Sequence, residues 1–280
     1  MHTLTPLRRR LLVGGAASLA LPYLARAQAT SLIAINDGVT YRPGAGSDTD
    51  DRYAVLVKDL NKALGSKLVI QKVPKYVDLA IGLTAGEYDM AFVHPGHHAI
   101  RALQSKQYKL AAVSKSHINY KANFLVRGDS KVTKPEDLSG KTVYLPDADS
   151  ITAWMARACF VEMYDKSMPL PKFVSLRYQD AIRFAVENHM GWAGATAAMG
   201  EVRAWAAAKH RVLFTSKNIP IKQFLVHQRM ASQVDATREF LLSQTDTVRI
   251  SVPDGFAPYE EAALIKAWDW LGKGVIPPGA

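Results

Sequence analysis

The chain has 280 residues, of which 48% are hydrophobic and 21% are charged, and it contains a single cysteine. This composition is typical of a globular protein, and one cysteine excludes an internal disulfide. The lysines and arginines behind the formal net charge of +10 are scattered rather than clustered, so we expect a small anionic ligand and no nucleic acid as partner.

The first 27 residues have the pattern of an export signal. Three arginines at positions 8–10 precede an apolar run that extends to Leu24, as in cleaved secretory signals. The run contains glycine, serine and proline and is too short to cross a bilayer, so a permanent anchor is the weaker interpretation. The paired arginines resemble a twin-arginine signal. We therefore expect a periplasmic protein whose mature chain starts near Gln28.

Strands alternate with helices in the first half of the predicted mature chain. Apolar residues recur at helical spacing between Tyr53 and Leu64, which predicts an amphipathic helix between two strands. The predicted elements are strand 31–35, loop 37–51, helix 53–64, strand 68–70, helix 76–85 and strand 89–93. This alternation is typical of a largely parallel sheet that binds ligands at the carboxyl ends of its strands.

The second half follows the same logic. Prolines and glycines punctuate short apolar runs, which we interpret as strands and helices of a second unit. The predicted elements are an extended segment at 124–126, strand 141–145, helix 152–164, strand 173–176, helix 180–187, strands 211–215 and 223–226, and helices 235–242 and 259–271.

A turn rich in hydroxyl and acidic residues, at positions 147–152, joins strand 141–145 to the helix that follows. Backbone N–H groups at the start of a helix have no partner within the helix, and with hydroxyls beside them they form a ready anion site. Ser150 is equally a good N-cap residue without any ligand. From these residues alone, a plain cap is the favoured interpretation.

Four segments taken in order resemble a known family. They are residues 86–95, residues 127–130 leading to 137–141, the turn at 147–152, and residues 178–181. In this order they are similar to the phosphate/phosphonate substrate-binding proteins of bacterial ABC importers, a branch of the type II periplasmic binding fold. Together they span most of residues 30 to 230.

The resemblance implies an α/β fold of two lobes. Each lobe is expected to be a mixed, largely parallel sheet flanked by helices, and two crossover strands are expected to join the lobes. After the export signal at 1–27, lobe 1 should contain residues 28–122 and 219–280, and lobe 2 should contain residues 123–218.

The resemblance also implies a ligand site between the lobes. Family members bind an oxyanion with hydroxyls and N–H groups at a helix start, a role that falls here to Ser150, Ile151 and Thr152. A further contact comes from the first loop, where Tyr41 is the candidate, although a surface tyrosine packed on Pro43 is an equal alternative.

This chain departs from the family pattern at three places. Where the family has Gly-Pro and then a tyrosine, the chain has His94, Pro95 and, at the tyrosine position, His98. We expect both histidines to contact the ligand. If they titrate near neutrality, protonation would favour anion capture and make affinity depend on pH.

The other two departures lie in the second lobe. Tyr178 and Gln179 replace a Ser/Gly-His pair, and Trp192 replaces an aspartate. The resemblance places all three at the ligand, with Trp192 as an apolar wall. The loss of that acid weakens the case for an aminoalkylphosphonate, whose ammonium group requires a carboxylate.

Alternatives to simple anion binding are less well supported. Three imidazoles, His94, His97 and His98, could bind a metal, but no carboxylate or cysteine lies near them in the sequence, so we expect no metal and no cofactor. Cys159 shares helical spacing with Met155 and Met163 and is expected to be a buried structural residue. No catalytic motif is present, so a periplasmic hydrolase ranks third.

We therefore expect a monomeric periplasmic protein that captures phosphate, phosphite, phosphonate or a similar oxyanion for an inner-membrane ABC permease. The alternative is a ligand-sensing co-receptor that docks on a membrane sensor kinase. The fold serves either role, and the residues do not distinguish them.

Overall fold

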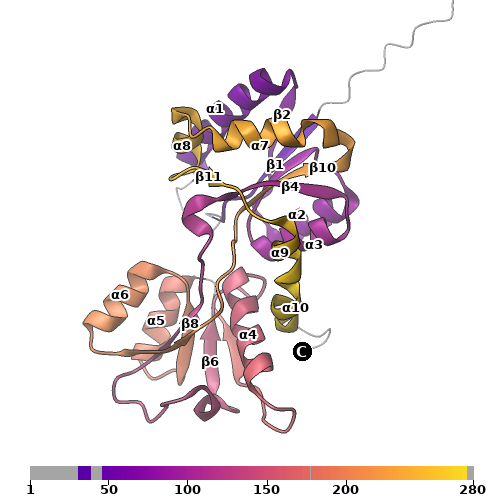
Figure 1. Cartoon of the computed structure of the whole chain (residues 1–280). Coiled ribbons are helices and arrows are strands. Elements are labelled where there is room, and N and C mark those ends of the chain that lie inside the picture. The colour runs from indigo at the N-terminus through magenta and orange to yellow at the C-terminus, as the bar shows by residue number, and fades with distance from the viewer. Residues whose placement is uncertain (1–30, 39–45, 177, 276–280) are drawn as a thin grey trace, which may run out of the picture.

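The structure is a computed structural model that describes residues 31–38, 46–176 and 178–275, without the side chains of residues 46–52. The expected export signal at 1–27 and the candidate ligand residue Tyr41 lie outside this description. The described residues form two lobes, each built on a β-sheet with helices packed against it (Figure 1). None of the helices in this part of the chain has the length and apolar character needed to cross a membrane.

The first lobe contains a six-stranded mixed sheet in the order β11-β4-β10-β3-β1-β2. Strand β1 pairs in parallel with β2 and β3, whereas β10 runs antiparallel between β3 and β4. Its elements are β1 (Ser31–Ile35), α1 (Gly46–Leu64), β2 (Leu68–Lys72), α2 (Tyr76–Ala85), β3 (Met90–Val93), α3 (Gly96–Gln104), β4 (Tyr108–Ser114), β10 (Gln223–His227), η3 (Gln228–Gln233), α7 (Val234–Leu242), α8 (Asp246–Ser251), β11 (Phe256–Ala257) and α9 (Glu261–Lys266).

Alternation along β1 explains why helices cover both faces of this sheet. Ile33 and Ile35 belong to an apolar cluster with α1, α7 and α8, whereas Ala34 points to the opposite face and packs with α2 and α3. All three side chains are buried. Because successive side chains of a strand point to opposite faces, an uninterrupted apolar run is stable only when both faces are covered.

The second lobe contains a five-stranded mixed sheet in the order β7-β6-β8-β5-β9. Strand β6 pairs in parallel with β7 and β8, and β5 runs antiparallel to β8 and β9. Its elements are β5 (Asn123–Val126), η2 (Pro135–Leu138), β6 (Thr142–Leu145), α4 (Ile151–Met163), β7 (Lys172–Ser175), α5 (Gln179–Glu187), β8 (Ala193–Thr196), α6 (Met199–Ala207) and β9 (Arg211–Thr215).

Two chain segments cross between the lobes, as predicted. One runs from β4 through η1 (Lys115–His117) to β5, and the other joins β9 to β10. They lie side by side, because Tyr120 and Ile219 form an antiparallel bridge and the Ser216 N–H donates to the Ala122 carbonyl at 2.9 Å. Paired crossovers of this kind allow two rigid lobes to move relative to each other.

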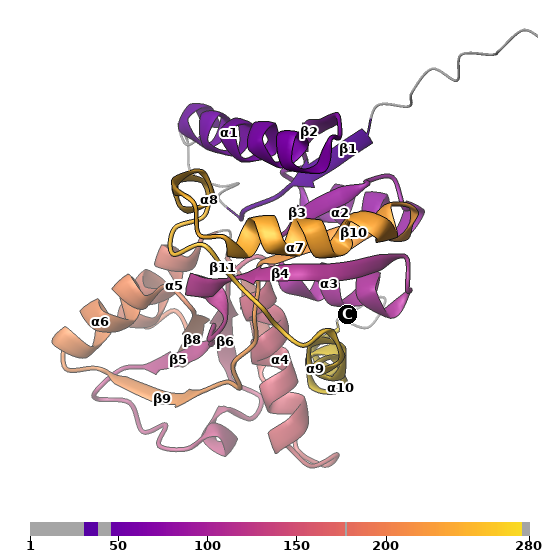
Figure 2. The ribbon, with the colours of Figure 1, turned by 45° about the horizontal axis from the view of Figure 1, so that its top comes forward.

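The C-terminal segment differs from the prediction of one helix over 259–271. It forms α9, α10 (Trp268–Leu271) and η4 (Gly272–Gly274), with a break at Ala267. Helix α9 packs on α3 of the first lobe, whereas α10 and η4 pack on α4 of the second lobe (Figure 2). The Arg157 Nε donates to the Gly274 carbonyl at 2.6 Å. The chain end therefore connects the two lobes a third time.

Candidate functional site

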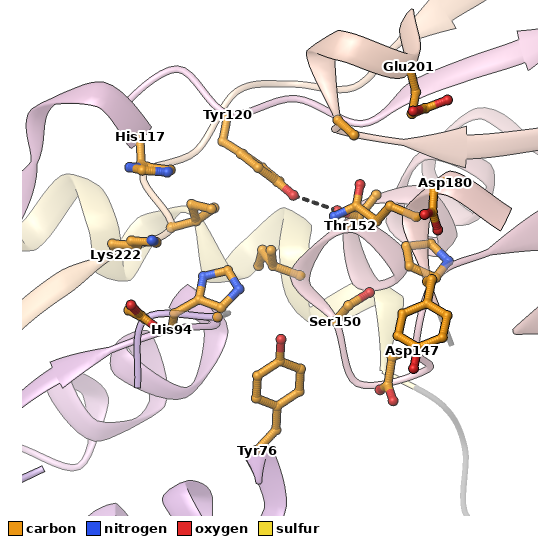
Figure 3. Close-up of a pocket in the computed structure, with 18 residues that line it drawn as sticks. Tyr76, His94, His117, Tyr120, Asp147, Ser150, Thr152, Asp180, Glu201 and Lys222 are labelled. Atoms are coloured by element: carbon orange, nitrogen blue, oxygen red, sulfur yellow. Dashed lines mark hydrogen bonds between the residues drawn. The ribbon is translucent and has the colours of Figure 1, made fainter. Parts of the chain in front are cut away.

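A cavity of about 840 Å³ lies between the lobes, and side chains from both of them line it (Figure 3). The second lobe contributes the start of α4 and the start of α5, together with Ala198 and Glu201 near α6. The first lobe contributes Asp37, Gly38, Tyr76 and His94. The crossover segments contribute the rest of the lining, which is His117, Tyr120, Ile221 and Lys222.

Helix α4 begins at the cavity with a capped N-terminus. Ser150 has extended backbone angles (φ −70°, ψ 147°), and its Oγ accepts a hydrogen bond from the Ala153 N–H at 3.2 Å. The predicted cap is therefore present. The N–H groups of the next two residues, Ile151 and Thr152, have no acceptor among the described residues, as is usual for the first turn of a helix. All three residues line the cavity.

The Thr152 hydroxyl is oriented by a chain of polar groups. Tyr120, from the first crossover, places its hydroxyl 2.8 Å from Thr152 Oγ1, and Gln179 also bonds to the Tyr120 hydroxyl. The Gln179 Oε1 already accepts from Thr196 Oγ1 at 3.0 Å and from the Ala197 N–H at 2.9 Å.

The amide NH₂ of Gln179 is therefore the group that faces Tyr120 and donates to it. Tyr120 and Thr152 share one hydrogen bond in which either hydroxyl can be the donor. Burial raises the pKa of the Tyr120 hydroxyl, which therefore stays protonated and can donate to Thr152. When Tyr120 is the donor, the Thr152 hydroxyl hydrogen is available to a ligand.

The opposite wall is formed by an imidazole and a phenol. Figure 3 shows the hydroxyl of Tyr76 pointing into the cavity between His94 and Ser150. The His94 ring contacts Tyr76 edge-on, with 6.0 Å between ring centroids. It also packs against Gly38, which has a φ of +79° and where a Cβ atom would lie 2.3 Å from His94 Cδ2. Only glycine fits this approach of the backbone to the ring.

The histidines of the cavity are held neutral. Burial lowers the pKa of His94 well below its usual 6.5, and the charge of Lys222 lowers it further. Burial and Lys222 also lower the pKa of His117 to about 4. His94 therefore does not meet the condition, titration near neutral pH, under which protonation would favour anion capture.

The charges of the lining are mixed. Among the lining residues that the structure describes, Lys222 supplies the one lysine or arginine charge. Four acidic side chains also line the cavity, namely Asp37, Asp147, Asp180 and Glu201. An anion would therefore be bound by N–H and hydroxyl donors and by Lys222, whereas the acidic groups would suit the donor groups of a ligand.

Six of the candidate residues from the sequence meet at this cavity. They are His94, Ser150, Ile151, Thr152, Tyr178 and Gln179. His98 and Trp192 do not line it. His98 belongs to α3 instead of a loop, and its Nε2 lies 3.1 Å from Asp149 Oδ2 on the far side of the turn. Trp192 precedes β8, is 42% exposed, and lies under the Lys141 ammonium group at 4.5 Å.

Several lining residues were not predicted. Tyr120 and Lys222 lie in the crossover segments, Tyr76 starts α2, and Glu201 is in helix α6, an element that the sequence pattern did not indicate. Asp180 also lines the cavity and was not predicted. It could have been found more readily than the others, because it lies in one of the segments that carry the family resemblance.

The geometry defines a class of protein: a two-lobe α/β binding protein of the type II periplasmic kind, with a ligand cavity at the lobe interface. A model of the family described as "ABC transporter, phosphonate, periplasmic substrate-binding protein" matches residues 44–272. The chain belongs to this family. It is the periplasmic substrate-binding component of an ABC transporter, as the resemblance implied. A search of curated proteins finds no match.

Solved structures with the same fold cover most of the chain. XAC2383 from Xanthomonas citri, bound to ATP, has a TM-score of 0.68 at 14% identity over 88% of this chain and 96% of its own. PhnD1 from Prochlorococcus marinus, in complex with methylphosphonate, has a TM-score of 0.60 at 14% identity over 87% and 97%. The aliphatic sulphonate binding protein SsuA from Escherichia coli has a TM-score of 0.53 at 16% identity over 88% and 78%.

Proposed function

We propose that this protein captures a small oxyanion of the phosphate, phosphite or phosphonate class in the interlobe cavity and delivers it to an inner-membrane ABC permease. It acts by binding and release, without chemical turnover, as a monomer exported by its N-terminal segment. The observation that carries the proposal is the start of α4, where the hydroxyls of Ser150 and Thr152 line the cavity together with two N–H groups that have no acceptor among the described residues.

This constellation suits a tetrahedral oxyanion for a physical reason. The N–H groups of Ile151 and Thr152 point out of the helix end, where the helix dipole favours negative charge. Hydroxyls accept and donate, so Ser150 and Thr152 adapt to either protonation state of a phosphonate. Lys222 adds a full positive charge from the crossover on the first-lobe side of the cavity.

The acidic lining extends the ligand class. Trp192 stands where the family pattern has an aspartate, which weakens the case for an aminoalkylphosphonate. Asp180 and Glu201 nevertheless place carboxylates at the cavity, on the same lobe as the start of α4. A ligand with an oxyanion at one end and an ammonium or hydroxyl group at the other would satisfy both parts of the lining.

The test is a binding titration of the purified mature protein by calorimetry. Probes are phosphate, phosphite, methylphosphonate, 2-aminoethylphosphonate, sulfate and acetate, with methylphosphonate included because PhnD1 was solved with it. We expect saturable binding of at least one phosphorus oxyanion, weakened in Thr152→Val, which removes the hydroxyl and keeps the branched shape. Ser139→Ala is the control, because its hydroxyl bonds to the Pro169 carbonyl away from the cavity. Binding of none of the phosphorus oxyanions would contradict the proposal.

A further inference from the structure

Two adjacent histidines of the first lobe converge on one carboxylate of the second lobe. His97 Nε2 lies 3.1 Å from Asp149 Oδ1, and His98 Nε2 lies 3.1 Å from Asp149 Oδ2. The histidines are in the first turn of α3, whereas Asp149 directly precedes Ser150, the cap of α4. The contact therefore joins the first lobe to the turn that forms the candidate anion site.

The surroundings of this contact are well packed. His97 is fully buried, and its ring stacks on the Trp154 indole with 4.2 Å between centroids and an angle of 16°. The Trp154 Nε1 also donates to Asp149 Oδ1 at 3.2 Å. His98 is 5% exposed. Three N–H donors thus hold one carboxylate, two of them from the opposite lobe. The Asp149 side chain is 40% exposed, and hydrogen bonds to a charged acceptor are stronger than those between neutral groups.

We propose that Asp149 is a positioning residue, held by His97 and His98, that fixes the start of α4 against the first lobe. The lobes open and close by rotation about this contact. The start of α4 stays in place, and the side of the second lobe that carries α5 and α6 moves. This inference rests on the proposed anion site only for its effect on affinity. The contact itself can be tested in the ligand-free protein, through the spread of the distance between the lobes.

Direct hydrogen bonds explain the approach of His97 and His98 to Asp149 better than a cation bound between them does. The three side chains offer ligand atoms within 4.8 Å of one another, although no carboxylate lies near these histidines in the sequence. However, the two imidazoles face different oxygens of Asp149, as the two N–H groups of an arginine do in a fork-like pair. The guanidinium of Arg157 also acts on His97 and on Asp149, and its positive charge disfavours a cation there.

Helix α4 has a second connection, to the C-terminal segment. Gly274 of the C-terminal segment approaches the Trp154 backbone so closely that a Cβ atom would lie 2.0 Å from its carbonyl oxygen. The Trp268 ring contacts the Trp154 ring at 5.7 Å, and Arg157 bonds to the Gly274 carbonyl. Helix α4 is thus held by the first lobe at its start and by the chain end at its middle.

The cavity wall formed by α5 and α6 has different packing partners from the start of α4. Helices α5 and α6 pack on strands β5, β6, β8 and β9 of their own sheet and on each other. A rotation of the second lobe about the start of α4 would leave Ser150 and Thr152 in place and would move the α5 and α6 side of the lobe, which carries Asp180 and Glu201. The anion site would then be preformed, and closure would bring the acidic wall onto the ligand.

The test is a distance measurement between spin labels on the two lobes. Ile81→Cys in α2 and Phe184→Cys in α5 provide labelling sites that are 59% and 63% exposed. The native Cys159 does not interfere, because it is buried and burial raises its pKa to about 12. In the otherwise unchanged protein without ligand, we expect one narrow distance distribution.

Asp149→Asn and His97→Phe are the test variants, and the phenylalanine keeps the stack on Trp154 while it removes the nitrogen atoms. Both should broaden the distribution and shift it to longer distances, and both should weaken binding of any phosphorus oxyanion that the unsubstituted protein binds. Asp165→Asn is the matched control, because this carboxylate bonds within its own loop to Ser167. His98→Phe supplies a second variant if Asp149→Asn does not fold.

Unchanged distributions in the variants would overturn the inference. A second outcome would also overturn it: a distribution in the unsubstituted protein that is broad after treatment with a chelator and narrow only with added Zn²⁺ would identify a metal site instead of a direct contact. Narrow distributions without any anion binding would leave this inference standing and would contradict the proposed function alone.

Discussion

The hydroxyl of Tyr120 lies 2.8 Å from Thr152 Oγ1, so the first crossover segment touches the start of α4 inside the cavity. Tyr120 is also the crossover residue that pairs with Ile219 of the second crossover. One residue therefore contacts both the hinge and the candidate anion site. A ligand bound at Thr152 would act directly on the segment that has to bend when the lobes move.

Replacing Tyr120 by phenylalanine should weaken anion binding. The change removes the hydroxyl that shares a hydrogen bond with Thr152 Oγ1, so the threonine hydroxyl loses its fixed orientation. A net hydrogen bond contributes about 1 kcal/mol, and we expect the Kd of the bound oxyanion to rise roughly fivefold. Calorimetric titration measures this change.

Tyr164→Phe is the matched control for this prediction. Its hydroxyl donates to the Pro135 carbonyl at 2.6 Å, away from the cavity lining. This variant should lose stability and keep its affinity. Equal Kd values for Tyr120→Phe and the unsubstituted protein would show that the crossover hydroxyl does not position Thr152.

Gly38→Ala should damage the first-lobe wall of the cavity. Gly38 has a φ of +79°, and a Cβ atom there would lie 2.3 Å from His94 Cδ2. Gly140 has a φ of +67° with nothing within 4 Å of a Cβ atom, so Gly140→Ala isolates the backbone cost of about 1 kcal/mol. We expect urea unfolding to show a larger loss for Gly38→Ala, and calorimetry to show weaker anion binding in that variant alone. Equal losses in both variants, with unchanged binding, would contradict the prediction.

Most of the fold was predictable because its signals are local. Strands β1, β3 and β9 and helices α2 and α5 lie within a residue of the predicted bounds, since apolar periodicity and glycine punctuation decide such elements. The elements that were missed include strand β4 and helix α6. Both contain several alanines, which add little to either hydrophobic period. The break at Ala267 reflects packing of α10 on α4 of the second lobe. Hydrophobic periodicity along the sequence cannot predict such a tertiary contact.

The site was predictable only where the family resemblance reached. Ser150, Ile151 and Thr152 follow from a strand, a turn and a capped helix start, which are adjacent in sequence. Tyr120 and Lys222 come from crossovers about a hundred residues apart, so their approach depends on the relative placement of the lobes. His98 was placed at the ligand from its position in the family pattern, whereas in this structure α3 starts at Gly96 and its side chain contacts Asp149.

Cys159 should be inert in the native protein. The structure confirms the predicted burial, and burial raises the pKa of this thiol to about 12. Because the thiolate is the reactive form, we expect the native protein to react with a thiol reagent such as DTNB many times more slowly than the protein in urea. Absorbance at neutral pH follows the reaction. Equal rates in both conditions would show that helix α4 opens readily and would contradict the packing described for it.

Acidification should destabilise the folded protein well above the pKa values of its carboxyl groups. Burial lowers the pKa of His97 from 6.5 to about 3, so between these values the unfolded chain binds a proton that the folded protein excludes. The free energy of unfolding therefore falls as the pH decreases from about 6.5, by about 1.4 kcal/mol per pH unit for this one group. His117, whose pKa is lowered to about 4, acts in the same direction.

Urea unfolding at pH 7, pH 5.5 and pH 4.5 measures this dependence, and His97→Phe provides the comparison. Phenylalanine keeps the stacked ring and cannot be protonated, so the variant should lose less stability between pH 7 and pH 4.5 than the unsubstituted protein. His117→Asn should reduce the slope independently, because this histidine lies in the crossover and bonds to Ser114. If the slopes of all three proteins coincide, the buried histidines take up protons in the folded state and the interface around Asp149 is open to water.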